Sequence, residues 1–284
     1  MLSNSFHCRR RFAMKCSAVF LALFLLAGCS SGPRIDTSFT SKGQNSRIQY
    51  VVVHYTSADL PRSLALLTHG EVSAHYLIST SPVITYRLVD ENRRAWHAGV
   101  SQWQGRTWLN ASSIGIELVN PGFEEQPDGT LRWIPYDDAQ IDALIVLLKD
   151  IVRRHDLPLG SIIGHSDIAP QRKTDPGPMF PWKRLADAGL VPWPDAELAA
   201  RYQARFEQAL PAVLWWQQQL AAQGYEVPQH GVLDGATRKV IGAFQMKYRP
   251  ARFDGEPDAQ TAALLLSLNQ VSARPEWPQI GSAR

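Results

Sequence analysis

Short apolar runs predict the strands of a β-sheet in the first two thirds of the chain. The clearest run is Tyr50-Val51-Val52-Val53, whose β-branched residues are typical of a buried strand, and His54 follows it directly. A second segment alternates strictly, with apolar residues on one face and Gly115 and Glu117 on the other. By the same reasoning, the sequence predicts strands at residues 48–55, 74–78, 83–88, 95–99, 113–120 and 162–163, the second and third as a hairpin.

Helical periodicity is strongest over residues 137–155. Apolar residues recur there at the spacing of one helical face, with aspartates at the start and basic residues at the end to complement the helix dipole. A shorter helix is predicted over 62–69, behind Pro61. Strands mixed with helices in this way predict an α/β (α+β) domain over residues 48–190, with a mixed β-sheet flanked by helices.

The pattern changes after residue 190. Residues 191–204 begin with Val-Pro-Trp-Pro-Asp and have the composition of a linker. Three amphipathic helices are then predicted over 213–223, 236–248 and 258–268, separated by turns that contain Asp-Gly. We therefore expect a small all-helical C-terminal domain over residues 205–270, followed by a tail over 271–284.

The first 28 residues have the features of an export signal. Basic residues precede the apolar run 18–27, which is too short to span a bilayer comfortably. The run ends Leu-Ala-Gly-Cys and resembles a bacterial lipobox, in which Cys29 is lipidated. Residues 1–28 are thus predicted to be a lipoprotein signal peptide, and residues 29–47 a flexible tether. Ser30 favours an outer-membrane lipoprotein facing the periplasm; an uncleaved apolar anchor is the alternative.

Charge and cysteine content limit the possible partners and the possible metal ligands. Four of the 29 basic residues lie in the signal segment, which leaves 25 basic against 26 acidic residues and gives no argument for a nucleic-acid partner. The three cysteines lie at positions 8, 16 and 29, so any metal in the folded part must be held by nitrogen and oxygen donors. No heptad pattern or self-complementary seam is visible, and we expect a monomer.

Two histidines and one aspartate are candidates for a hydrolytic metal site. His54 and His165 both follow apolar runs, as residues at adjacent strand ends do. Asp175 lies on a loop stiffened by prolines. A hydrolytic zinc site needs three protein ligands and one open position, and two imidazoles with a carboxylate keep the metal electrophilic. Paired structural polar groups are the alternative.

Two further residues are candidates for proton transfer and charge stabilisation. Glu117 is a lone carboxylate on an apolar strand, where burial would raise its pKa as a general base requires; a core carboxylate paired with arginine is the alternative. Lys173 could stabilise an oxyanion, or be a solvated loop lysine. We interpret His75 as a structural strand histidine, and leave His97 and Asn110 open between lining a substrate cleft and a structural role.

These residues belong to motifs that together resemble the zinc N-acetylmuramoyl-L-alanine amidase family (amidase type 2), and with the lipobox its AmiD-type lipoprotein branch. The resemblance covers residues 48–188 and rests on Val52-Val53-His54-Tyr55-Thr56, Val72-Ser73-Ala74-His75-Tyr76, Trp96-His97-Ala98-Gly99, Ser113-Ile114-Gly115-Ile116-Glu117 and Gly164-His165 with Lys173-Thr174-Asp175-Pro176-Gly177. It implies that His54, His165 and Asp175 bind Zn²⁺. It also implies that Glu117 is the base and that Lys173 stabilises the transition state.

The implied reaction is hydrolysis of the amide between N-acetylmuramic acid and L-alanine. Intact peptidoglycan and soluble muropeptides, with the ordinary or the 1,6-anhydro sugar, are both open as substrates. Residues 205–268 resemble a three-helix peptidoglycan-binding domain, on motifs that include Gly224-Tyr225, Asp234-Gly235 and Phe244-Gln245. We therefore expect a lipid-anchored enzyme of cell wall turnover; a non-catalytic peptidoglycan-recognition protein of the same fold is the alternative.

Overall fold

The computed structural model describes residues 32–272. The predicted signal peptide with its lipidation site Cys29, and most of the predicted tail, lie outside the described residues. The chain divides into two units at residue 44, and residues 32–44 of the first unit contain no helix or strand. No helix within residues 32–272 is long and apolar enough to cross a membrane.

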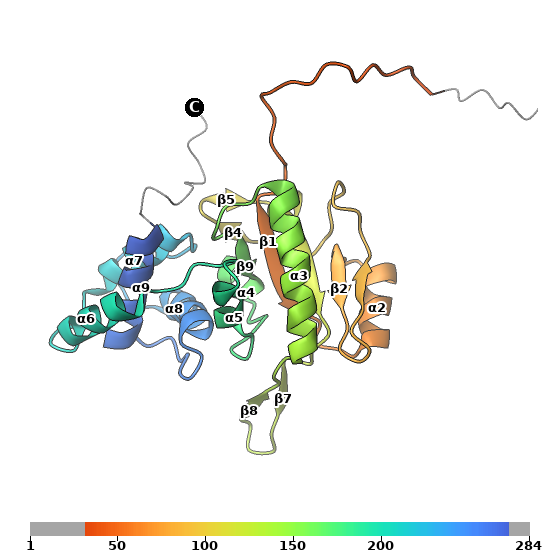
Figure 1. Ribbon diagram of the computed structural model, residues 1–284. Helices are drawn as coiled ribbons and strands as arrows, with labels where there is room; N and C mark the ends of the chain where they lie inside the picture. Colours follow the sequence, from red (N-terminus) through yellow and green to blue (C-terminus); the bar gives the residue numbers. More distant parts are fainter. Residues whose placement is uncertain (1–31, 273–284) are drawn as a thin grey trace, which may run out of the picture. The chain divides into compact units, whose positions relative to one another are not determined.

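A five-stranded mixed sheet forms the centre of the second unit, in the strand order β3-β2-β6-β1-β9 (Figure 1). Its central strand β1 is parallel to both neighbours, β6 and β9, and only the edge strand β3 runs antiparallel, to β2. The strands are β1 (Tyr50–Tyr55), β2 (Tyr76–Ile78), β3 (Thr85–Arg87), β6 (Ser113–Leu118) and β9 (Ile162–Gly164). The mixed sheet flanked by helices confirms the predicted fold class.

The two faces of the sheet have different partners. Val51 and Val53 of β1 and the apolar face of β6 pack with helix α3 (Asp138–His155), which lies along the sheet in Figure 1, and with α5 (Trp182–Asp187). Tyr50 and Val52 face the other way, into a cluster that includes residues of the C-terminal helices. Because strand side chains alternate, His54 shares the face of Val52, away from α3.

Smaller elements surround this core. Helix α2 (Leu60–His69) begins with a side-chain cap from Asp59 and packs against the β2 end of the sheet. The β7–β8 hairpin projects from the lower edge of the sheet in Figure 1. The remaining short elements are β4 (Gln102–Trp103), β5 (Arg106–Thr107), the 3₁₀ turn η1 (Leu109–Ala111), β7 (Phe123–Glu125), β8 (Leu131–Trp133) and α4 (His165–Ile168).

The C-terminal region is a helical module made of α6 (Ala196–Phe206), α7 (Val213–Gln223), α8 (Gly235–Tyr248) and α9 (Ala259–Ser272). Its core is continuous with that of the first domain, because one apolar cluster includes Tyr50 and Val52 of β1 together with Trp216 and Phe244 of the module. Trp216 is buried and its neighbour Trp215 only partly so, as expected for adjacent residues on a helix.

Two segments differ from the sequence-based expectation. Residues 191–204, expected to be a linker, contain most of α6, which starts at an Asp195 cap and buries Ala199 and Phe206. The apolar residues of α6 recur at helical spacing, and packing against α9 stabilises the helix. The prolines at the start of the segment led to the prediction of a linker. Residues 95–99 form irregular backbone with bends rather than a strand, because the N–H groups of His97 and Ala98 donate to the Asn110 side chain instead of to a neighbouring strand.

Candidate active site

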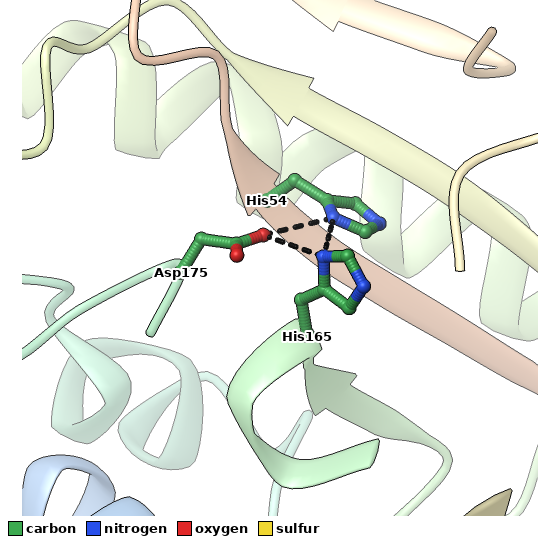
Figure 2. A group of neighbouring side chains, drawn as sticks. All are labelled: His54, His165 and Asp175. Atoms are coloured by element: carbon green, nitrogen blue, oxygen red, sulfur yellow. Dashed lines mark hydrogen bonds and ion pairs between the residues drawn. The ribbon is translucent and has the colours of Figure 1, made fainter. Parts of the chain in front are cut away.

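Three predicted site residues, from two distant segments of the sequence, converge on one point (Figure 2). His54 lies near the end of β1, His165 is the first residue of α4 after β9, and Asp175 comes from the following loop. The Nδ1 atoms of the two histidines are 3.0 Å apart, and Asp175 Oδ2 lies 3.0 Å from one and 2.9 Å from the other. All three side chains are buried.

Hydrogen bonds on the far side of the His165 ring determine its tautomer. Its Nε2 lies 3.2 Å from the carbonyl oxygen of Ala98, which can only accept a hydrogen bond. Arg172 Nη2 lies 3.4 Å from the same His165 nitrogen. Its protons are already used, because it donates to Ala98 O at 2.5 Å and to Val100 O at 2.7 Å. We therefore assign the proton of neutral His165 to Nε2, which leaves a lone pair on Nδ1.

A longer chain of hydrogen bonds determines the tautomer of His54. The Ser113 hydroxyl donates to the Leu109 carbonyl at 2.6 Å, so its oxygen accepts from His97 Nε2–H at 3.2 Å. His97 Nδ1 must then accept from His54 Nε2–H, at 3.1 Å. His54 Nδ1 is consequently unprotonated as well and faces the same point as His165 Nδ1.

With both imidazoles neutral, three acceptors face one another with no proton among them, an arrangement suited to holding a cation. Two imidazole nitrogens and a carboxylate oxygen form a donor set typical of a catalytic zinc site. Donors bound tetrahedrally at about 2.0–2.1 Å from zinc lie about 3.3 Å from one another, close to the distances between these atoms. Among residues 32–272, these three residues form the one group of this kind.

Electrostatics agrees with this interpretation. Burial, reinforced by the neighbouring His165, lowers the pKa of His54 to about 4, so the imidazole is neutral at pH 7 and able to bind a metal. Burial by itself would raise the pKa of Asp175, so a buried carboxylate here depends on positive charge beside it, which holds the pKa below its usual range.

Glu117 lies beside this centre. It pairs with His54 across the β6–β1 ladder, and its Oε2 is buried with no hydrogen-bond partner. Burial and the charge of Asp175 raise its pKa well above the usual value, and the charge of Lys173 offsets this only in part. Among residues 32–272, no arginine pairs with Glu117, which argues against the alternative of a core carboxylate paired with arginine. Lys173 is partly buried.

The other predicted residues are placed as follows. His75 is buried, with Nδ1 accepting from Gly115 N–H and Nε2 next to the Arg93 carbonyl, which confirms a structural role. His97 is also structural, because both ring nitrogens are used in the chain that ends at His54. Asn110 Oδ1 accepts from the backbone N–H groups of His97 and Ala98 at 3.0 and 2.8 Å, and Asn110 also lines a groove.

That groove has a volume of about 970 Å³, and one of its lining residues, Arg172, lies 3.4 Å from His165 Nε2. Trp96 and Trp108 line it and are largely exposed, and Arg94 stacks on Trp96 at 4.2 Å. Residues 226–228 and Ala236 of the helical module also line it. The sequence analysis missed Trp108 and Arg172. The signals available in the sequence were a tryptophan between the motifs at 96–99 and 113–117 and an arginine in the loop between His165 and Asp175.

Comparisons with known proteins identify the family. The model of the N-acetylmuramoyl-L-alanine amidase family matches residues 44–178, and that of a putative peptidoglycan binding domain matches residues 210–265. The N-acetylmuramoyl-L-alanine amidase AmiD of Escherichia coli is 41% identical over 262 residues, which cover 87% of this chain and 94% of AmiD. This chain belongs to the N-acetylmuramoyl-L-alanine amidases.

Solved structures of similar amidases have the same fold. The complex of Escherichia coli AmiD with anhydro-N-acetylmuramic acid-L-Ala-D-gamma-Glu-L-Lys matches with a TM-score of 0.76 at 40% identity, over 84% of this chain and 95% of that one. AmpDh3 from Pseudomonas aeruginosa in complex with anhydromuramic pentapeptide matches with a TM-score of 0.77 at 38% identity, over 85% and 98% of the two chains. Both matches extend over the helical module as well as the amidase domain.

Proposed function

We propose that this amidase is zinc-dependent and hydrolyses the amide between N-acetylmuramic acid and L-alanine in peptidoglycan fragments. The observation that carries the proposal is the convergence of three unprotonated donors, from His54, His165 and Asp175, beside the unpaired carboxyl of Glu117. A non-catalytic recognition protein of the same fold would not need both features. The amidase family to which the chain belongs gives independent support.

The roles follow from the surroundings of each residue. Zinc held by the three donors would polarise the scissile carbonyl and acidify the attacking water. Glu117 takes the proton from that water and delivers it to the departing amino group of L-alanine; burial raises its pKa above that of an exposed glutamate, which strengthens it as a base. Lys173 stabilises the negative charge that develops on the carbonyl oxygen.

We further propose that the groove next to Arg172 holds the sugar. Trp108 is 77% exposed and Trp96 is 49% exposed, and flat aromatic faces of this kind provide large, rigid contact area for an amphipathic ligand. The substrates named in the structures of AmiD and AmpDh3 carry an anhydro sugar with a stem peptide. Soluble anhydro-muropeptides are accordingly the first substrates to test, with the helical module providing affinity for intact peptidoglycan.

The decisive experiment is hydrolysis of a purified anhydro-muropeptide by the protein lacking residues 1–29. The reaction is followed by mass spectrometry, with and without a chelator. Release of an intact stem peptide that begins with L-alanine, abolished by the chelator and restored by zinc, is the expected result. Binding of the muropeptide without cleavage by the zinc-loaded protein would favour the recognition protein instead.

For localisation we propose a monomeric lipoprotein, anchored through Cys29 to the outer membrane and facing the periplasm. The support is the lipobox-like end of the apolar run and Ser30 after the cysteine. Several acyl chains together anchor a protein firmly, whereas one alone binds weakly. Fractionation should find wild type in the outer membrane and Cys29→Ala released from it; a variant that stays in the membrane indicates an uncleaved apolar anchor.

A further inference from the structure

We propose that the helical module is a structural part of the metal centre, in addition to any affinity for peptidoglycan. Its residues Lys247 and Tyr225 are positioning residues that act through Asp167 on the helix that begins with His165. The inference rests on the proposed zinc-dependent function, because it concerns the precision with which His165 is held.

Asp167 fixes the backbone on which His165 is mounted. Its Oδ2 accepts a hydrogen bond from Gly164 N–H at 2.8 Å, directly before His165. On the other side of His165, Ser166 N–H donates to the backbone carbonyl of Asp175 at 2.8 Å. The orientation of His165 relative to Asp175 thus depends on a single turn of helix that the Asp167 carboxylate closes.

This carboxylate is 1% exposed and needs compensation for its charge. Both partners come from the module: Lys247 Nζ on α8 lies 2.7 Å from Oδ2, and the Tyr225 hydroxyl donates to Oδ1 at 2.7 Å. Lys247 is itself buried and stacks at 4.1 Å over Trp182 of the amidase domain. A buried charge pair of this geometry links the two regions far more specifically than apolar contact does.

The surroundings leave little room for α4 to adjust on its own. A Cβ atom at Gly164 would lie 2.8 Å from Pro176 and 3.3 Å from Trp182, so the turn is tightly enclosed. The loop between the two metal-facing residues is held at a second point, where Gln171 donates to Ala236 O and accepts from Lys239 Nζ. The module therefore contacts the segment that carries both His165 and Asp175 at two separate places.

The test compares three variants of the protein lacking residues 1–29. Lys247→Met removes the buried ammonium but keeps an unbranched side chain, and Tyr225→Phe removes only the hydroxyl. Arg238→Met is the matched control: it lies on the same helix, but its ion pair with Glu256 is exposed and within the module. Zinc affinity is measured by competition with a chelating indicator at 25 °C, and ligand geometry by the visible spectrum of the cobalt-substituted protein.

We expect the zinc Kd of Lys247→Met to rise by about tenfold or more, the range seen when groups that orient metal ligands are removed. Its cobalt spectrum should change, and its kcat/KM at limiting zinc should fall with metal occupancy. Tyr225→Phe should show a smaller rise in the same direction, and Arg238→Met should match wild type. Circular dichroism of the zinc-free proteins establishes that each variant is folded at 25 °C.

A purely structural role would lower the unfolding temperature and leave the zinc Kd and the cobalt spectrum of the folded protein unchanged. That result for Lys247→Met would overturn the inference and leave the proposed function intact, since wild type would still bind zinc and cleave substrate. Should Lys247→Met not fold, Tyr225→Phe decides by the same criterion. A wild-type protein without zinc affinity would overturn the inference and the proposed function together.

Discussion

Replacing Gly115 by alanine tests whether the orientation of His54 depends on the packing of His97. Gly115 lies on β6, and the ring of His97 packs directly against its backbone. A Cβ atom at this position would lie 2.4 Å from Cγ, 2.6 Å from Cδ2 and 2.7 Å from Nδ1 of His97. Ordinary Cβ contacts begin at 3.4 Å, so the ring must retreat by about 1 Å.

That movement affects the hydrogen bonds at both ring nitrogens. His97 is held between His54 Nε2 at 3.1 Å and Ser113 Oγ at 3.2 Å, and a displaced ring bends or lengthens both bonds. Overpacking costs about 1–3 kcal/mol. In a chain of this size, that corresponds to a fall of about 2–12 °C in the unfolding temperature. Loss of the group that orients a metal ligand weakens metal binding by about 10–100-fold.

The assay measures the unfolding temperature of the zinc-free protein and the zinc Kd at 25 °C. Gly235→Ala is the matched control, because it adds the same methyl group where no atom lies within 4 Å. We expect the control to retain wild-type zinc affinity. Wild-type stability and zinc affinity in Gly115→Ala would refute the argument that His97 is confined by this glycine and orients His54.

Three further predictions concern the metal, the base and acid stability. Asp175→Ala should lose zinc, measured by elemental analysis, together with activity, because two ligands seldom hold a catalytic metal; stoichiometric zinc in this variant would contradict the ligand assignment. Glu117→Gln should keep zinc but reduce kcat by about 10²–10⁴-fold, and a near-normal rate would exclude it as the base. Burial would raise the pKa of Glu91, but hydrogen bonds from three neighbours, chiefly Arg154, lower it to about 2 from an ordinary 4.5. Since the pKa of Glu91 is lower in the folded state, Glu91 stabilises the protein above about pH 4.5 and loses this effect as the pH falls towards 2. Glu91→Gln should therefore lower the unfolding temperature more at pH 7 than at pH 3. Equal decreases at the two pH values would contradict the lowered pKa of Glu91.

The sequence alone determined the elements that depend on local pattern. The apolar run 50–53 identified β1 and the alternation over 113–120 identified β6, and helical spacing located α3 and three helices of the module to within a few residues. Short-range periodicity carries this information because an amphipathic strand or helix has one way to bury its apolar face. The apolar runs around His54, Glu117 and His165 likewise placed these residues at strand ends or within strands.

Local pattern could not predict the structure or role of residues that are buried by a segment far away in the sequence. The segment that contains α6 was predicted to be a linker, and only its packing against α9 shows that its apolar side is buried. The sequence left the role of His97 open because that role depends on tertiary contacts. Gly115 packs against its ring, and Ser113 and His54 hydrogen-bond to its two nitrogens.

The protonation pattern of the site and its support from the module are properties of the tertiary structure alone. Lys247 lies three residues after Phe244 and so shares its side of α8, which the structure shows to be buried. This spacing was the one sign in the sequence that the ammonium group of Lys247 is not exposed to solvent. Its partner Asp167 lies 80 residues earlier in the chain. Nothing in the spacing of either segment specifies that contact, because a buried ion pair forms only when packing excludes water from both groups at once.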